Sequence, residues 1–356
     1  MPKTGHFILT SWLSWGLICA LFVALPFHSN ASQSGIENCE DVTLAATTGV
    51  PILQSYSLYG KLCHPDDGPS DTVQILVHGY TYDHRYWSLP DFGEAYDYVK
   101  SANEAGFSTL AIDRIGSAGE SSRPLSALVT LQTGANALHD VVSAARSGAL
   151  PGGPYENVVT VGHSLGAAIA WIEASVYDDV DGIISTGFGH PAGAVQDILI
   201  NTAPAVLDSR LRPLVGLDIG YLTTAPGSRD SVFYNAETRE EGIIDYDETT
   251  KGLGTASEIA TLSTAELATL NISVPVLFVI GQYDNLFCLG ESIGGFVNCQ
   301  NAQTVFASEK AYFPLVADFE TYVLYGAGHN INLHQGAENW FGKAADWMAQ
   351  RFGAAH

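Results

Sequence analysis

Residues 156–177 read ENVVTVGHSLGAAIAWIEASVY and carry two different local patterns on either side of one serine. The residues before the first glycine are rich in β-branched side chains, which favour a buried strand. Those after the second glycine are rich in alanine, with Ile169, Ile172 and Val176 at helical spacing. The segment therefore predicts a strand, a sharp turn and a helix, with Ser164 at the tip of the turn. Glycines two residues before and after the serine fit this prediction, because side chains there would collide with the strand and the helix.

A serine at such a turn needs two further groups before it can act as a nucleophile. Its hydroxyl is a poor nucleophile at neutral pH, so a base must accept its proton and a third group must orient the base. Two later residues fit: Asp284 follows an apolar run at residues 274–280, and His329 follows a run at residues 321–325. His334 is an alternative base, although the glycines beside His329 favour a tight loop at a strand end. Asp284 could instead be an ordinary turn or N-cap aspartate.

The chain order of serine, acid and histidine, each placed after a strand, resembles that of the α/β-hydrolase family. The resemblance covers nearly all of the chain beyond its N-terminal segment. It implies a doubly wound α/β fold: a mostly parallel sheet with helices on both faces and a mainly helical cap inserted between core strands. It also implies that Ser164, Asp284 and His329 form a catalytic triad.

Two further segments resemble loops of the same family. His78-Gly79-Tyr80 follows an apolar run at residues 73–77 and is similar to the turn from which the family takes an oxyanion-binding amide. By this resemblance, the backbone N–H groups of Tyr80 and Leu165 would form the oxyanion hole. Residues 113–121 resemble the family's Asp-x-x-Gly-x-Gly-x-Ser loop, with one extra residue between the glycines.

Strand-like and helical runs alternate along most of the chain, as a parallel sheet with crossover helices requires. The predicted strands are residues 73–77, 108–113, 158–162, 182–186, 274–280 and 321–325, and the predicted helices are residues 92–105, 133–146, 167–177, 256–270 and 338–352. An opening antiparallel pair is expected around residues 52–63. The alternation stops over residues 190–272, so we expect the cap there, between core parts at residues 32–189 and 273–356.

Substrate choice is expected to depend on the cap, where the sequence is least informative. Its apolar side chains suit an acyl or alcohol group, or they simply attach the cap to the core. They are Leu207, Leu211, Leu214, Leu217, Tyr221, Leu222, Phe233 and Tyr234. A second aromatic group follows the predicted oxyanion turn and is a candidate for the mouth of the pocket, although such clusters as often serve packing. It consists of Tyr80, Tyr82, His84, Tyr86 and Trp87.

The N-terminus and the cysteines predict an exported protein. Residues 1–31 are largely apolar and end in small residues, which indicates a cleaved signal peptide; a retained membrane anchor is the alternative. Beyond this segment four cysteines remain, an even number that favours disulfides in an exported chain. Four cysteines allow three pairings, and proximity in the sequence favours Cys39 with Cys63 and Cys288 with Cys299.

The charge of the chain restricts its partners. It has 15 basic and 38 acidic residues and a net charge of −23, so nucleic acids, anionic membrane surfaces and anionic substrates are disfavoured. We find no H-x-x-x-H or C-x-x-C pair, so metal catalysis is not expected, and no cofactor is expected either.

These observations together predict a secreted serine hydrolase that cleaves uncharged carboxylic esters or lactones through an acyl-enzyme. Two alternatives stay open. The same three residues could act on another bond, as in peptidases, carbon–carbon hydrolases or perhydrolases, or the chain could be a non-catalytic binding protein on a hydrolase fold. A serine at the turn argues against the relatives that use an aspartate there.

Overall fold

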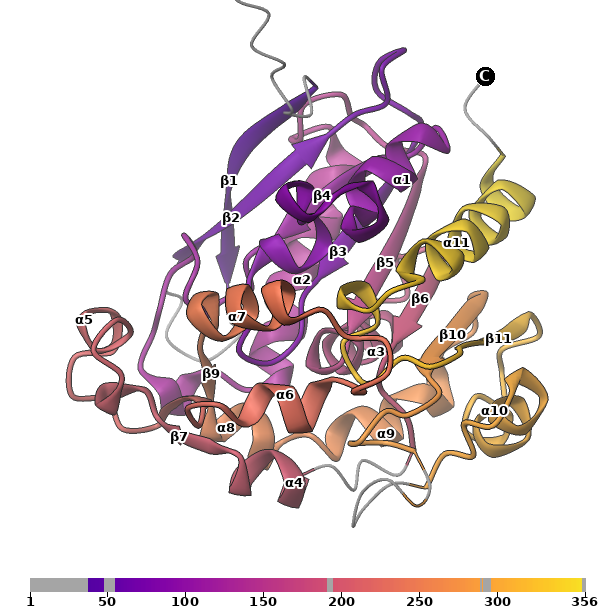
Figure 1. The fold of residues 1–356 in the computed structure, drawn as a ribbon. Coiled ribbons are helices and arrows are strands. Elements are labelled where there is room, and N and C mark those ends of the chain that lie inside the picture. Colours follow the sequence, from indigo (N-terminus) through magenta and orange to yellow (C-terminus); the bar gives the residue numbers. More distant parts are fainter. Residues whose placement is uncertain (1–37, 48–54, 191–194, 289, 291–295, 354–356) are drawn as a thin grey trace, which may run out of the picture. The chain divides into compact units, whose positions relative to one another are not determined.

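An eight-stranded, mostly parallel sheet forms the centre of the protein (Figure 1). It is seen in a computed structural model that describes residues 38–47, 55–190, 195–288, 290 and 296–353, all within the unit Gly35–His356. The strand order is β1-β2-β4-β3-β5-β6-β10-β11; β1 pairs with β2 and β2 with β4 in antiparallel fashion, and the other neighbouring strands are parallel. The strands are β1 (Cys39–Thr47), β2 (Ser55–Cys63), β3 (Thr72–Val77), β4 (Ser108–Ile112), β5 (Asn157–His163), β6 (Gly182–Thr186), β10 (Val276–Gly281) and β11 (Phe319–Leu324).

The burial of each strand follows from its place in the sheet. β3, β4, β6 and β10 are buried along their whole length, as expected for parallel strands with helices on both faces. At the edge, Val42, Leu44 and Ala46 of β1 are buried and alternate with exposed or half-buried residues, so only one face of this strand meets the core.

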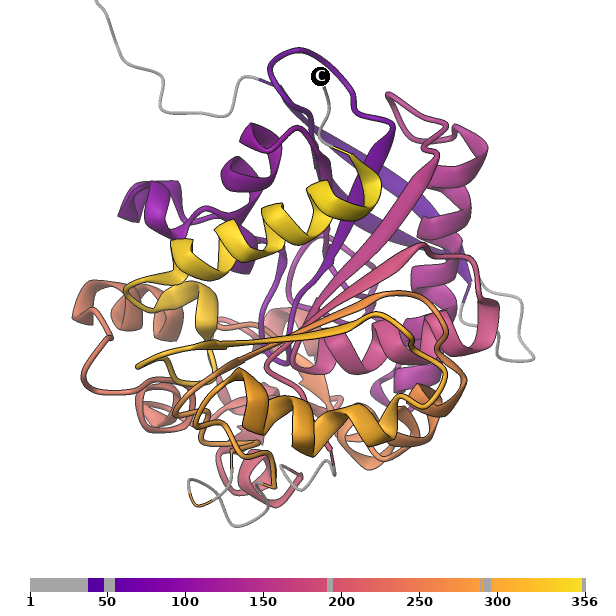
Figure 2. The same ribbon diagram turned by 90° about the vertical axis from the view of Figure 1, so that its right-hand side faces the viewer.

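Helices cover both faces of the sheet, so the predicted fold class is confirmed. α2 (Leu131–Ser147) and α3 (Leu165–Tyr177) pack against each other and against β1 and β5. α1 (Tyr98–Glu104) and α11 (Ala337–Phe352) pack together on the opposite side, as Figure 2 shows. α10 (Ala302–Glu309) lies against β11.

The segment between β6 and β10, residues 195–271, is called the insertion below. It is mainly helical, as predicted, with α4 (Val195–Ile200), α5 (Arg212–Val215), α6 (Ser228–Phe233), α7 (Glu241–Thr250), α8 (Ala256–Ala260) and α9 (Thr264–Ala268). It also contains an antiparallel sheet of β7 (Thr202–Pro204), β8 (Tyr221–Thr224) and β9 (Gly254–Thr255), which the sequence analysis missed. Strands this short do not display a period of two.

Three predicted elements have wrong boundaries. The opening pair joins β1 to β2 and so begins at Cys39. Alanine occurs on both faces of β1, exposed at Ala45 and buried at Ala46, which hides the alternation of this strand. The helix expected at residues 92–105 begins only at Tyr98, capped by Asp97 and preceded by short 3-10 turns. The helix expected at residues 256–270 is broken after α8, where the Thr261 hydroxyl donates to the carbonyls of Ser257 and Glu258.

Both predicted disulfides are present, joining Cys39 to Cys63 and Cys288 to Cys299. The predicted signal peptide at residues 1–31 lies outside the described residues. Within the described part of the chain, no helix has the length and apolarity needed to cross a membrane.

A buried carboxyl group between α2 and α3 gives a first prediction. The Glu173 side chain is fully buried, with His139 and Asp179 as its ionisable neighbours. Burial raises the pKa of Glu173 to about 10, and the neighbouring Asp179 carboxylate contributes to the shift. Since glutamate in the unfolded chain has a pKa of about 4.3, this group favours the folded state most at low pH. That contribution to stability is lost as the pH rises from about 4.3 toward 10.

Glu173→Gln is therefore expected to raise the free energy of unfolding by about 1–3 kcal/mol at pH 8, since the amide carries no ionisation cost. The gain should be smaller at pH 5. Urea unfolding at both pH values measures it, with the exposed Glu156→Gln as control. If the free energy of unfolding of Glu173→Gln had the same pH dependence as that of the wild-type protein, the assignment of a protonated Glu173 would be contradicted.

Candidate active site

The predicted serine stands on a strained turn between β5 and α3. Ser164 has φ 53° and ψ −120°, in the region of positive φ that favours glycine, and its side chain is buried. A Cβ atom on Gly162 would lie 2.5 Å from the Cα of Ala167, and one on Gly166 would lie 2.1 Å from the carbonyl oxygen of Val77. Both positions therefore require glycine, for the steric reason that the sequence suggested.

The structure brings the other two predicted residues to this serine. His329 Nε2 lies 2.9 Å from Ser164 Oγ, and His329 Nδ1 lies 2.8 Å from Asp284 Oδ2. A carboxylate only accepts hydrogen bonds, so Nδ1 carries the hydrogen and Nε2 is left to accept from the serine hydroxyl. Asp284 and His329 follow β10 and β11, and all three side chains are buried.

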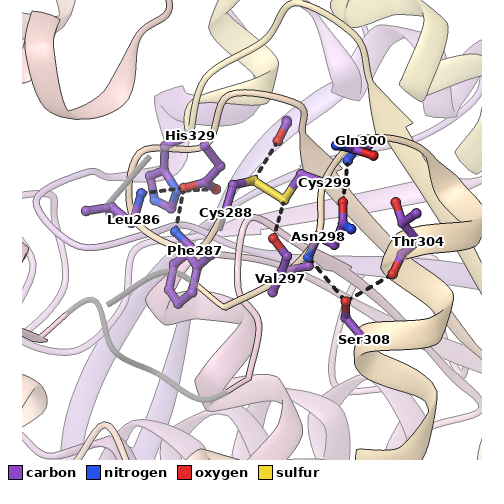
Figure 3. Close-up of a disulfide and its surroundings, with 12 residues drawn as sticks. Leu286, Phe287, Cys288, Val297, Asn298, Cys299, Gln300, Thr304, Ser308 and His329 are labelled. Carbon is purple, nitrogen blue, oxygen red and sulfur yellow. Dashed lines mark hydrogen bonds and ion pairs between the residues drawn. A yellow bond between two sulfur atoms is a disulfide. The ribbon is translucent and has the colours of Figure 1, made fainter. Parts of the chain in front are cut away.

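Asp284 is fixed by its own loop. Its Oδ1 accepts the N–H groups of Leu286 (2.8 Å) and Phe287 (3.2 Å), and its carbonyl accepts the N–H of Cys288 (3.0 Å). The disulfide to Cys299 follows immediately, and its Cys288 sulfur lies 3.3 Å from the Gly281 carbonyl oxygen (Figure 3). The turn that carries the acid is thus tied both to the end of β10 and to the segment that precedes α10.

This arrangement predicts that the disulfide supports the position of Asp284. Cys288→Ser with Cys299→Ser is expected to lower kcat about three- to tenfold, since small displacements of reacting groups are costly, and to lower stability by up to roughly 3 kcal/mol. The matched control is Cys39→Ser with Cys63→Ser, which removes the bridge between β1 and β2. Equal kcat values for both double variants, assayed well below their melting temperatures, would assign the Cys288 bridge a purely stabilising role.

The alternative base, His334, is not placed against Ser164. Its Nε2 accepts the N–H of Gly328 (3.0 Å), and its Nδ1 lies 2.9 Å from the Thr238 hydroxyl. Burial lowers the pKa of His334 to about 4, which keeps the ring neutral and able to accept that bond. His334 therefore holds the loop that carries His329.

The turn at residues 78–80 packs directly against the serine. A Cβ atom on Gly79 would lie 3.2 Å from the Cβ of Ser164, so glycine permits this approach without a shift of the neighbouring atoms. Leu165 is the first residue of α3, whose N-terminal N–H groups lack partners within the helix. Neither the Tyr80 N–H nor the Leu165 N–H donates to an acceptor in the part of the chain that the structure describes. Their role as an oxyanion hole stays a prediction that this placement supports.

The loop at residues 113–121 is organised by the Asp113 carboxylate. Its Oδ1 accepts the His84 N–H and its Oδ2 accepts the Glu120 N–H, at 2.9 and 2.7 Å. A Cβ atom on Gly119 would lie 1.9 Å from Oδ2, which explains that glycine. The extra residue between the two glycines does not prevent the loop from closing, since Ser121 Oγ donates back to the Asp113 carbonyl.

A pocket of about 390 Å3, including its opening to solvent, lies at Ser164 and His329. The core contributes Tyr80, Tyr82 and Leu286, and the insertion contributes Ile198, Asn201, Thr202, Thr224, Val232 and Phe233. These described lining residues carry no formal charge apart from a protonated His329. The pocket therefore suits an uncharged, largely apolar group.

Most of the side chains predicted to form the pocket lie elsewhere. Of the apolar cap residues, only Phe233 lines it; Leu207 and Leu217 are exposed, and Leu211 and Tyr221 form a small core within the insertion. Of the aromatic group after β3, Tyr80 and Tyr82 line the pocket. His84, Tyr86 and Trp87 instead contact Asp113, His163 and Tyr98, respectively.

The sequence also gave no indication of a buried ion pair that links the insertion to the core. Arg229 of α6 is fully buried, and its Nη2 donates to Asp247 Oδ1 at 2.7 Å. Its Nη1 donates to the Thr81 hydroxyl at 2.9 Å, and the Tyr82 hydroxyl donates to Asp247 Oδ2 at 3.0 Å. The insertion is thereby joined to the loop that follows the Gly79 turn.

Two groups of potential metal ligands lie close together among the described residues: Asp83, His84 and Asp113, and His139, Glu173 and Asp179. None of these six side chains lines the pocket.

Comparison with known proteins agrees with this geometry. A model of the alpha/beta hydrolase family matches residues 74–339. A search of curated proteins found no match. Among solved structures, a thermophilic esterase from Thermogutta terrifontis is similar, with a TM-score of 0.58 and 17% identity over 87% of this chain and 98% of that one.

Two further structures share the fold at similarly low sequence identity. An esterase from Pyrococcus furiosus has a TM-score of 0.54 and 15% identity, covering 89% of this chain and 92% of its own. A bromoperoxidase from Bacillus anthracis has a TM-score of 0.53 and 17% identity, covering 86% of this chain and 99% of its own. Since the family model spans most of the sequence and includes most of β3 and all of β4 to β6, β10 and β11 of the observed sheet, the chain belongs to the alpha/beta hydrolase family.

Proposed function

We propose that the protein is a serine hydrolase that cleaves carboxylic esters, with lactones included as internal esters. The observation that carries this proposal is the continuous chain from Ser164 Oγ through His329 to Asp284, with both links below 3 Å, at the wall of an uncharged pocket. Esterases among the structural neighbours support the same reaction class.

In the proposed reaction, Ser164 Oγ attacks the ester carbonyl carbon while His329 Nε2 accepts the hydroxyl proton. Asp284 stabilises the resulting imidazolium, and the N–H groups of Tyr80 and Leu165 receive the negative oxygen. The tetrahedral intermediate collapses when His329 gives its proton to the departing alcohol, which leaves an acyl group on Ser164. Water then attacks this acyl-enzyme with the same residues in the same roles, releasing the carboxylic acid.

The pocket and the net charge define the class of substrate. The insertion, which lies within the predicted cap at residues 190–272, supplies Val232 and Phe233 to the pocket lining, and the core supplies Tyr80 and Leu286. An uncharged ester gains binding free energy from contact with these groups. An anionic ester would find no cationic side chain among the described lining residues, and the net charge of −23 would repel it.

We also propose that the protein works outside the reducing cytosol. Its two disulfides join Cys39 to Cys63 and Cys288 to Cys299, and such bridges persist in oxidising compartments. This agrees with the signal peptide predicted at residues 1–31.

Purified protein treated with a fluorophosphonate probe, alongside a series of p-nitrophenyl esters of increasing acyl length, tests the proposed function. Labelling together with ester turnover is expected. Labelling without turnover would favour another bond as the target, as in a peptidase, a carbon–carbon hydrolase or a perhydrolase. Neither labelling nor turnover would favour a binding protein.

A further inference from the structure

We infer that Arg114 and Glu258 are positioning residues that hold the Tyr80 amide in the orientation needed to bind the oxyanion; this inference rests on the proposed function. Arg114 is the second residue of the loop at residues 113–121, and Glu258 belongs to α8 of the insertion. They are 4% and 2% exposed, and Arg114 Nη1 donates to Glu258 Oε1. Neither residue lines the described part of the pocket.

Two donors converge on the carbonyl oxygen of Gly79. Arg114 Nη2 donates to it at 3.2 Å, and His78 Nδ1 lies 2.9 Å from it. The backbone N–H of Arg114 donates to His78 Nε2 at 3.1 Å, so Nδ1 must carry the ring hydrogen and donate to Gly79. Burial and the nearby Arg114 charge hold the pKa of His78 well below its usual range, so the ring stays neutral in this arrangement.

The oxygen that these donors fix belongs to the same peptide unit as the Tyr80 N–H. In a trans peptide the C=O and N–H bonds point in opposite directions within one plane. Anchoring the Gly79 oxygen on the Arg114 side therefore directs the Tyr80 N–H to the other side. A positive donor on the oxygen also polarises the amide, which strengthens its N–H as a donor.

The insertion fixes the other end of Tyr80 through the same glutamate. Glu258 Oε2 accepts the N–H of Thr255 at 2.8 Å, and the Thr255 carbonyl oxygen lies 3.3 Å from the Tyr80 hydroxyl that donates to it. A Cβ atom on Gly254 would lie 1.9 Å from the Tyr80 ring, so the ring lies directly on this backbone. Glu258 thus links the ring contact of Tyr80 to the guanidinium that orients its amide.

Stability alone is a weak explanation for this ion pair. The free-energy cost of removing two charges from water offsets the gain from their attraction. Buried ion pairs can therefore often be replaced by apolar side chains without loss of stability. The orientation of a peptide plane beside the nucleophile, in contrast, needs a fixed donor at the Gly79 oxygen. The arrangement also assigns a function to a loop whose part in the reaction the sequence did not reveal.

Arg114→Met is expected to lower kcat about 10- to 100-fold, less than the loss reported when an oxyanion donor is removed altogether, while KM changes little. A trifluoromethyl ketone, which forms a charged tetrahedral adduct with the serine, should lose affinity by the same factor as kcat/KM. Affinity for the uncharged alcohol product should not change. Arg114→Lys, which keeps the charge, should fall between Arg114→Met and the wild-type protein.

Val142→Ala on α2 is the control for destabilisation, since Val142 is fully buried away from the site. Should Arg114→Met fail to fold, Glu258→Gln, which keeps side-chain volume, is expected to give a smaller loss in the same direction. Two results would overturn the inference. One is a trifluoromethyl ketone affinity that stays at the wild-type value in the Arg114 or Glu258 variant. The other is an equal loss of kcat in Val142→Ala at the same melting temperature.

A readout independent of turnover separates this inference from the proposed function. In protein labelled with ¹⁵N-tyrosine, the Tyr80 amide resonance, assigned by its loss in Tyr80→Phe, should move upfield in Arg114→Met because its N–H is less polarised. A wild-type protein without esterase activity would refute the proposed function, and this shift would still show that Arg114 orients the amide. An unmoved Tyr80 resonance would refute the positioning role itself.

Discussion

Replacing Ser164 with alanine is expected to abolish ester hydrolysis, with kcat lowered about 10⁵- to 10⁶-fold. The hydroxyl is the nucleophile that forms the acyl-enzyme in the proposed reaction, and His329 Nε2 already lies 2.9 Å from it. His329→Ala should cause a loss of similar size, because the serine then has no base. Since the residues act as a unit, the double variant should be little worse than either single one. Initial rates on a p-nitrophenyl ester, measured with high enzyme concentrations, give these ratios.

The matched control for this experiment is Ser185→Ala, which removes another buried serine hydroxyl, on β6, and should leave kcat unchanged. The melting temperatures of all variants show whether the fold is retained. An active His329→Ala enzyme beside an inactive His334→Ala enzyme would mean that the base has been assigned to the wrong histidine.

The second large effect is expected for Asp284→Asn, which should lower kcat by about 10⁴-fold. Oδ1 of Asp284 accepts two backbone N–H groups, so an asparagine must place its carbonyl oxygen there. Its NH2 group then takes the place of Oδ2 and faces His329 Nδ1. That contact favours the tautomer with hydrogen on Nε2, which can no longer accept the proton of Ser164.

Glu309→Gln provides a matched control for the loss of a buried carboxylate. Glu309 Oε1 accepts the backbone N–H of His190 at 3.0 Å, and Oε2 lies 2.7 Å from His190 Nδ1. As at Asp284, one carboxylate oxygen binds backbone and the other faces a histidine ring, but this pair does not line the described part of the pocket. This variant should keep its kcat. An Asp284→Asn enzyme within tenfold of the wild-type rate would show that the carboxylate does not orient the base.

The features that the sequence predicted best are those set by local chemistry. Gly162 and Gly166 could be interpreted from steric exclusion alone, and the structure shows the collisions that a side chain would cause at each. Asp284 and His329 could be placed because each follows an apolar strand, and parallel strands bring their carboxyl ends to one edge of the sheet. Local pattern and sheet geometry together therefore defined the candidate site.

The pocket and the buried ion pairs could not be predicted in this way. The packing of the short helices and strands of the insertion decides which of its apolar side chains reach the pocket. Phe233 lines the pocket, for example, whereas Leu217 is exposed. Arg114 and Glu258 are 144 residues apart, and nothing in either local sequence distinguishes a buried charge from a solvated one. Contacts of this kind appear only when the chain is folded.

The most direct test of the proposed mechanism is to trap the acyl-enzyme. Protein mixed with excess p-nitrophenyl ester, quenched with acid during turnover and digested, should carry the acyl group on the peptide that contains Ser164. The same peptide from His329→Ala should carry none. An acyl group on a different residue, or steady ester turnover with no acyl group on Ser164, would contradict the proposed mechanism.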